Sequence, residues 1–327
     1  MRRRELITLI GGAAAWPTVT REQQSASPPI GFLYSSTSES FREFLSPFRA
    51  VLAEVGFTEG RNVIFEDRIA EDHFERLPEL ADDLVHHGVA VIVTAGNVPA
   101  ALAAKAATQT IPIVFMMGAD PVGNGIVDGL ARPGGNVTGI TMLAGEVMQK
   151  RLALLRELVP AAAIIGLLVN PSNSSFTEAI LNQQVEAARR LGVRLLILNA
   201  SSPTEIERVF ATLTQQQVSA LLVGPDTFFV GQRDQLVALA ARHRIPTSYF
   251  RREFVQAGGL MSYAADDAEA ERQAAAYVGR ILKGERPNDL PVLQATKFEL
   301  VINLTTAKAL GLAIPASFLS LADELLE

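Results

Sequence analysis

The sequence predicts an α/β protein made of two doubly wound, parallel-sheet lobes joined by a multi-crossover hinge. Three observations support this fold class. Short apolar runs alternate with amphipathic segments from residue 28 onward, most of these runs are continuous, and the turn-rich residues 131–141 divide them into two sets. Continuous runs are typical of strands that helices cover on both faces. With 327 residues, 48% of them hydrophobic, the chain is long enough for two cores.

Strands are expected where aliphatic and β-branched residues cluster between turn residues. Such runs cover residues 30–34, 63–67, 89–94, 113–117, 164–169, 194–199, 220–224 and 247–250. A further apolar run at 298–304 follows after the second set is complete. We therefore expect the chain to cross back between the lobes near its C-terminus.

Helices are expected between the strands, where apolar side chains recur with i, i+3, i+4 spacing. These segments are 41–55, 74–85, 99–107, 145–158, 176–191, 204–215, 232–243 and 267–282. Pro47 falls inside the first, so this helix either continues through the proline or begins with Ser46 as its N-cap. Strands that alternate with helices predict βαβ units with right-handed crossovers.

Residues 1–27 predict an export signal. Arginines precede an apolar run from Leu6 to Ala15, which is too short to span a bilayer. Residues 3–7 read RRELI, the twin-arginine arrangement of the Tat route, so we expect the protein in the periplasm. Glu22 stands where a small residue would precede the cleavage site, so retention as an uncleaved tether is the alternative.

Composition and motifs exclude several classes of protein. The formal net charge of −6, with no stripe of Lys and Arg, predicts no nucleic-acid partner. Without cysteine the chain has no thiolate chemistry, and its four histidines show no metal-ligand spacing. Nucleophile-elbow, zincin, Walker and dinucleotide-binding motifs are missing, so we expect neither a cofactor nor an enzyme.

Polar residues follow the strands of both expected lobes. In open parallel sheets a ligand binds beyond the carboxyl ends of the strands, although the same residues are suited to capping the following helices. With one aromatic side chain near these loops, the candidate ligand-binding residues are Ser35, Ser36, Gly96, Asn97, Asp120, Asn170, Asp226, Thr227 and Tyr263.

The chemistry of these residues suggests a zwitterion. Helix N-termini near Ser36 and Asn97 suit a carboxylate, and Asp226 in the opposite lobe suits an ammonium group. We therefore expect a ligand such as an amino acid to be clamped between the two lobes.

Three motifs carry a resemblance that runs over essentially the whole chain: RPGGNVTG (132–139), GPDTFF (224–229) and INLTTAKALGL (302–312). With them the sequence resembles the ABC-transporter substrate-binding proteins of bacteria, a group that includes tryptophan- and tyrosine-binding lipoproteins. The resemblance implies a type I periplasmic-binding-protein fold whose two lobes, joined by three crossovers, close on a small ligand. It implies ligand contacts at Ser35, Ser36, Gly96, Asn97 and Asp226, and further ones at Asn170 and Tyr263.

The expected lobes are residues 28–140 with about 263–290, and residues 141–262 with about 291–327. The expected function is that of the monomeric solute-binding subunit of an ABC importer, whose closed form an inner-membrane ABC permease recognises. One alternative is a periplasmic sensor that presents the same ligand to a receptor or kinase. The other is an enzyme that uses Asp226 with Asp120.

Overall fold

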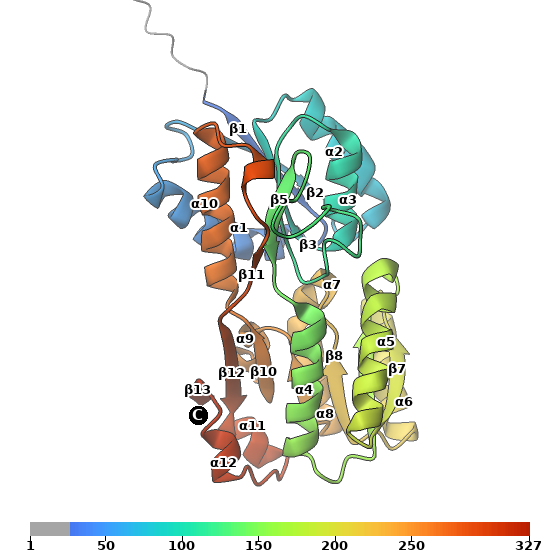
Figure 1. Cartoon of the computed structure of the whole chain (residues 1–327). Coiled ribbons are helices and arrows are strands. Elements are labelled where there is room, and N and C mark those ends of the chain that lie inside the picture. Colours follow the sequence, from blue (N-terminus) through green and yellow to red (C-terminus); the bar gives the residue numbers. More distant parts are fainter. Residues whose placement is uncertain (1–26) are drawn as a thin grey trace, which may run out of the picture.

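The computed structural model of the chain describes residues 27–327, apart from the side chains of residues 174–180. Residues 1–26, which hold nearly all of the expected export signal, lie outside the described residues. The described chain forms two lobes, each built on its own sheet (Figure 1). None of the helices in residues 27–327 combines the length and apolar character that crossing a bilayer requires.

The N-lobe is a six-stranded, all-parallel sheet in the order β11-β5-β4-β3-β1-β2. Its strands are β1 (Pro29–Tyr34), β2 (Ile64–Ile69), β3 (Val91–Gly96), β4 (Ile113–Met117), β5 (Val137–Thr141) and β11 (Leu293–Gln294). Helices α1 (Ser38–Glu54) and α10 (Asp267–Leu282) pack on one face. The other face carries α2 (Leu77–His86) and α3 (Val98–Ala107). Two short 3-10 helices, η1 (Phe74–Arg76) and η2 (Pro287–Asp289), complete this lobe.

The C-lobe is a seven-stranded sheet in the order β13-β12-β10-β9-β8-β6-β7, parallel except for the pair of β10 with β12. Its strands are β6 (Ile164–Val169), β7 (Arg194–Asn199), β8 (Ala220–Val223), β9 (Thr247–Tyr249), β10 (Met261–Ala265), β12 (Phe298–Asn303) and β13 (Glu324–Leu326). One face carries α4 (Ala144–Leu158), α5 (Ser174–Arg190), α11 (Leu304–Ala309) and α12 (Ala316–Leu319). The other carries α6 (Pro203–Gln215), α7 (Thr227–Gly231), α8 (Arg233–His243) and α9 (Arg252–Gln256).

This architecture confirms the predicted fold class. The continuous apolar runs are buried strands with helices on both sides, and β4, β6 and β7 have the predicted ends. Four short strands, β5, β10, β11 and β13, and three short helices, α7, α9 and α12, were not foreseen. β5 follows directly on a turn-rich stretch, β10 is rich in small residues and is held by its pairing with β12, and α7 is too short for a periodic pattern.

The first helix continues through Pro47 and does not begin at Ser46, the alternative start considered above. α1 begins after Thr37, whose side chain accepts a hydrogen bond from the Ser40 amide. Pro47 is exposed, so the N–H group that it lacks lies on the solvent side of the helix. Phe41, Phe44 and other apolar side chains of α1 remain on the buried face.

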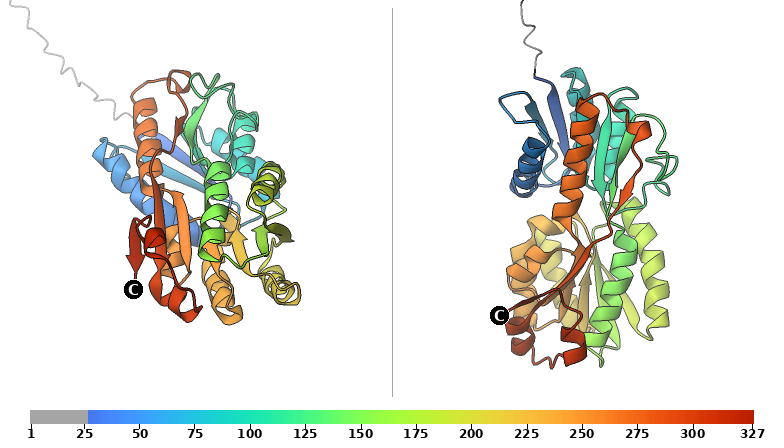
Figure 2. Two further views of the ribbon diagram at one scale, coloured as in Figure 1. Left: turned by 60° about the horizontal axis from the view of Figure 1, so that its bottom comes forward. Right: turned by 60° about the vertical axis from the view of Figure 1, so that its left-hand side comes forward.

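The chain crosses between the lobes three times, after β5, after β10 and after β11 (Figure 2). β10 belongs to the C-lobe sheet and β11 to the N-lobe sheet. The last two crossings therefore lie near residues 266 and 295–297, a few residues later than the expected boundaries at about 263 and 291. The three connecting segments together form the hinge.

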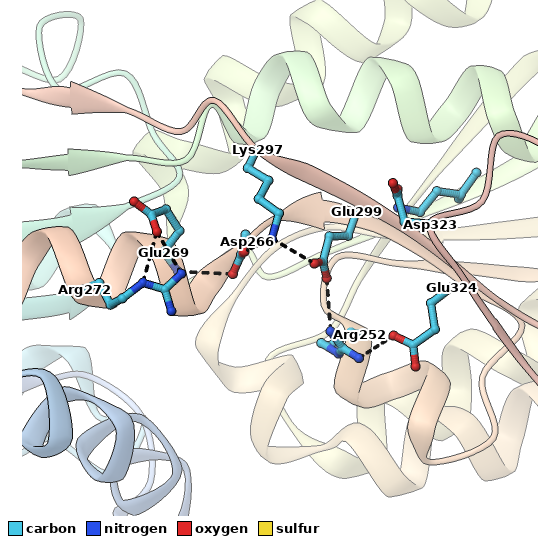
Figure 3. Close-up of polar contacts among 9 residues, drawn as sticks. Arg252, Asp266, Glu269, Arg272, Lys297, Glu299, Asp323 and Glu324 are labelled. Carbon is cyan, nitrogen blue, oxygen red and sulfur yellow. Dashed lines mark hydrogen bonds and ion pairs between the residues drawn. The ribbon is translucent and has the colours of Figure 1, made fainter.

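Paired charges line the last two crossings (Figure 3). Lys297 lies 2.7 Å from Asp266 and 3.5 Å from Glu299, and Glu299 accepts from Arg252 at 3.1 Å. Arg252 also contacts Glu324 at 2.5 Å. Together these five residues link the loop that leads into α10 with β12, α9 and β13, so oppositely charged partners bridge the backbone segments about which the lobes would rotate.

Candidate ligand-binding site

A cavity of about 110 Å³ lies between the lobes, beyond the carboxyl ends of strands from both sheets. We call it the interlobe cavity. Its lining comes from the segments that follow β3, β4, β5, β6, β8, β9 and β10, and from the first two turns of α4. The topology thus brings together strand ends that are far apart in the sequence, as expected for open parallel sheets.

Most of the cavity wall is apolar. Side chains of both lobes contribute: Val98, Met117, Met142, Val147, Val230 and Phe250. Methionine side chains adapt to the shape of an apolar partner, and an aromatic ring adds a flat contact surface. These walls suit a ligand with an apolar portion.

Asp226 places a buried carboxylate at this cavity. It follows β8 and caps α7, where its Oδ1 accepts from the Phe228 amide at 3.0 Å. Asn170 donates to the same oxygen at 2.9 Å, and Asn173 donates to Oδ2 at 3.0 Å. Burial raises the pKa of Asp226, while these three hydrogen bonds oppose the rise. Asp226 is 6% exposed, and no cation of the described residues lies within ion-pair distance.

The capping interpretation and the ligand interpretation of Asp226 are therefore compatible. A carboxylate oxygen accepts about two hydrogen bonds, so Oδ1 is occupied and Oδ2 retains room for one more. Asn173 adds a second acceptor, because its buried Oδ1 has no partner in the described structure. Both residues line the interlobe cavity.

Asn173 was missed in the sequence because only the first asparagine after β6 was selected. Asn170 and Asn173 belong to one polar turn, and the structure uses both to hold Asp226. The spacing of the two amides is the signal that points to them, since the turn after β6 can aim both at the neighbouring β8 loop.

The remaining polar candidates contact each other across the lobes. Ser35 and Thr227 share a hydrogen bond of 3.3 Å, and the Ser36 hydroxyl donates to the Thr227 carbonyl at 3.1 Å. Asn97 donates to the Ser35 hydroxyl at 2.5 Å and accepts from the Ala100 amide as the N-cap of α3. We call Ser35, Ser36, Gly96, Asn97 and Thr227 the interlobe latch. Its hydroxyls bind the opposite lobe directly.

Gly96 allows the latch to close. Its backbone has φ +108°, which favours glycine, and a Cβ atom built there would overlap the Thr227 methyl group. The close approach of the two lobes at this point thus depends on a residue with no side chain.

Ser35, Ser36 and Asn170 contact residues of the cavity wall without lining the cavity. Two other candidates, Asp120 and Tyr263, belong neither to the wall nor to these contacts. Asp120 is exposed, and its Oδ1 accepts from the Val122 amide within its own loop at 3.0 Å. Tyr263 packs against the C-lobe core, where its ring stacks on Phe298 with centroids 6.0 Å apart. The enzyme alternative requires Asp120 to lie close to Asp226, and the structure does not bring them together.

Arg151 is a cavity residue that sequence reasoning missed. It lies on α4 with Val147, Met148, Leu152 and Leu155, in the apolar stripe that packs on the sheet, and is buried with them. An arginine at a core position of an amphipathic helix is the signal that could have identified it. Across the described residues, no group of three or more His, Asp or Glu side chains could hold a metal ion.

Comparisons with known proteins agree with this geometry. The model of the ABC transporter substrate binding protein family matches residues 37–326. A tyrosine-binding protein of Clostridioides difficile is 26% identical over 265 residues, which cover 81% of this chain and 75% of that protein.

Solved structures share the fold over nearly the whole chain. A conserved domain protein of Vibrio cholerae O1 biovar El Tor has a TM-score of 0.83 at 25% identity, covering 91% of this chain and 99% of its own. An ABC domain from Streptococcus pneumoniae in complex with L-Trp has a TM-score of 0.82 at 25% identity, covering 92% and 100%. The family and the fold are those of solute-binding proteins rather than enzymes. The chain belongs to the ABC transporter substrate-binding protein family and has the type I periplasmic-binding-protein fold.

Proposed function

We propose that this protein is the extracytoplasmic solute-binding subunit of an ABC importer and that it binds an amino acid in the interlobe cavity. The observation that carries this proposal is the buried carboxylate of Asp226, which lines the cavity without a cationic partner in the described residues. A buried charge of this kind is stabilised when an opposite charge with hydrogen-bond donors approaches it. An ammonium group supplies both.

The walls support an amino acid with an apolar or aromatic side chain. Val98, Met117 and Phe250 surround the cavity, and few polar atoms lie among them. The names of two relatives agree with this class, since one is a tyrosine-binding protein and another was solved with L-Trp.

Lobe closure is the mechanism that we propose. The open protein binds the ligand on one lobe, and the second lobe then rotates about the hinge until the interlobe latch forms. The contacts of Ser35 and Ser36 with Thr227 exist only when the lobes meet. A ligand that fills the cavity therefore shifts the population towards the closed form.

An inner-membrane permease is the proposed partner, and the closed monomer is the form that it recognises. Export through the Tat route follows from the twin-arginine pattern of residues 3–7. A periplasmic sensor would use the same cavity and the same closure. Genes for a permease and an ATPase beside this one favour transport, whereas a lone kinase gene favours sensing.

The test is a thermal-shift screen of the purified protein against the twenty amino acids, followed by calorimetric titration. A ligand of the folded state raises the melting temperature. We expect Asp226→Asn to weaken binding by about 2 kcal/mol or more, roughly 30-fold, because the ammonium group loses its counter-charge. The matched control is Asp234→Asn, which changes an exposed acid of the same lobe. Equal affinity in the two variants would remove Asp226 from the site.

A further inference from the structure

Arg151 presents a guanidinium group to the interlobe cavity from the C-lobe side, with only 1% of its surface exposed. Its Nη2 donates to the backbone carbonyls of Val223 at 2.8 Å and Ser248 at 2.6 Å, and its Nε donates to the Ser248 hydroxyl at 3.4 Å. Its Nη1 makes no hydrogen bond to the described residues. Backbone and side-chain oxygens of β8 and β9 thus hold the guanidinium group in place, and some of its N–H donors remain unused.

No carboxylate of the described residues neutralises this charge. Burial alone lowers the pKa of Arg151 to about 9, with no contribution from an acid. A buried cation is costly unless a counter-charge approaches it, because water no longer solvates it. The site is therefore suited to a ligand that brings a negative charge.

Arg251, the other arginine of the cavity wall, provides the contrast. Its Nε lies 2.9 Å from Asp267 and 3.4 Å from Glu253. Burial opposes the charge of Arg251, but these carboxylates overcome that effect and raise its pKa. Its charge is satisfied within the protein, whereas that of Arg151 is not.

Another part of the same cavity wall is suited to a positively charged group. Asp226 and Asn173 offer one acceptor each, as described above, and both line the cavity with Arg151. Neither Arg151 nor Asp226 shifts the pKa of the other, so the two charges do not form a pair of their own. Positive and negative groups that share one apolar cavity without pairing match the two ends of a zwitterion.

We infer that Arg151 binds the carboxylate of the ligand while Asp226 and Asn173 accept hydrogen bonds from its ammonium group. This assignment rests on the proposed function and adds to it the residue that recognises the carboxylate. It replaces the expected carboxylate site at Ser36 and Asn97, because the latch occupies those groups.

With these contacts, the ligand binds to the two lobes in a defined order. α4, the turn after β6 and the loop after β8 all belong to the C-lobe, so this lobe alone holds both charged ends of the ligand. The N-lobe contributes apolar wall, such as Val98 and Met117, and one half of the latch. The ligand thus binds first to the C-lobe, and the N-lobe then covers its side chain.

The test compares an amino acid with its α-carboxamide, which keeps the ammonium group and removes the negative charge. Calorimetry is carried out on the wild type with L-tyrosine, L-tryptophan and their carboxamides, and with the pair for the amino acid that gives the largest shift in the screen. We expect the wild type to bind the acid at least ~10-fold more tightly than the amide, because a charge-assisted hydrogen bond is lost.

Arg151→Met should abolish this preference, lowering the affinity for the acid ~10-fold or more while that for the amide changes less than about threefold. Arg151→Lys should keep part of the preference, since it retains the charge. Arg156→Met, on the same helix and outside the cavity wall, is the matched control and should leave the preference unchanged. Unfolding curves check that each variant is folded.

Three outcomes would overturn the inference. The first is equal affinity of the wild type for acid and amide, a result that needs no variant. A folded Arg151→Met protein that loses both ligands to the same extent would assign Arg151 a purely structural role. If no amino acid binds the wild type at all, the proposed function fails first and this assignment fails with it, whereas either of the other results leaves amino-acid binding intact.

Discussion

The interlobe cavity and the hinge both hold charged side chains between the lobes, but Asp226 and Arg151 of the cavity lack an ion-pair partner among the described residues, whereas the hinge charges pair with each other. Lys297 and Asp266 lie 2.7 Å apart, and Glu299 joins them to the rest of the network. Asp226 and Arg151 share the wall of the cavity without an ion pair to any described residue. The hinge network is also more exposed, with 62% of the Lys297 side chain accessible.

On the proposed function, the unpaired charges of the cavity serve the ligand, and the paired charges of the hinge serve the fold. An exposed pair contributes little to stability and remains solvated when it breaks, so it suits a segment that moves. An isolated buried charge costs free energy in the absence of ligand, and a bound counter-charge recovers that free energy. We therefore expect a ligand to neutralise charges in the cavity rather than in the hinge.

The largest expected effect on ligand affinity comes from a change at the interlobe latch, beside the cavity. Gly96→Ala places a methyl group against Thr227, so the latch cannot close as it does here. We expect ligand affinity to fall by roughly 2 kcal/mol, because overpacking of this size costs about 1–3 kcal/mol. Calorimetric titration with the ligand from the amino-acid screen measures the loss.

Gly56→Ala is the control that distinguishes the effect of this clash from the effect of backbone strain. Gly56 has φ +102°, close to the +108° of Gly96, and no atom lies within 4 Å of an added Cβ. Both variants should lose similar stability in urea unfolding, and only Gly96→Ala should lose ligand affinity. Equal affinity losses would mean that the latch plays no part in closure.

A second effect, on stability rather than on ligand affinity, concerns Glu271, a hinge-side carboxylate of α10 that is 5% exposed. Burial raises the pKa of Glu271 to about 8; Asp267 adds to the rise and Arg251 opposes it. The folded state then binds more protons than the unfolded state, so this group lowers stability as the pH rises from about 4.5 to about 8. Glu271→Gln should remove that loss.

We expect Glu271→Gln to be more stable than the wild type at pH 8, by several kcal/mol, and nearly equal to it near pH 4.5. Thermal unfolding of both proteins across this range measures the difference. A variant that is less stable than the wild type at pH 8 would show that the carboxylate has a partner there after all.

The smallest expected effect belongs to the paired charges of the hinge. Lys297→Met removes one exposed member of the network, and such a member contributes little because water and salt screen it. The urea midpoint should stay close to that of the wild type, and ligand affinity should change less than about twofold. A large loss of affinity would mean that the hinge network, and not only the cavity, sets the closed state.

Much of the fold could be predicted because its signals are local. A strand such as Ile113–Met117 shows its burial on both faces as a continuous apolar run, and α10 shows its bounds through Asp266, which caps it. β10 has no such signal, since MSYAA is held as a strand by its neighbours on both sides. For the same reason the lobe boundaries, expected at about 263 and 291, differ by a few residues from the crossings near 266 and 295–297.

For the candidate site, the sequence by itself determined which loops meet, because the carboxyl ends of parallel strands share one edge of a sheet. Asp226 and Asn170 were identified on that basis, whereas Asn173 of the same turn was not. Only the tertiary structure decided what each side chain contacts. Ser36 and Asn97 are engaged in the latch, Tyr263 packs into the C-lobe core, and Arg151 reaches the cavity from a core position of α4. The physical reason is that local patterns determine burial and secondary structure, whereas the pairing of a charge depends on neighbours that only the folded chain brings within a few ångströms.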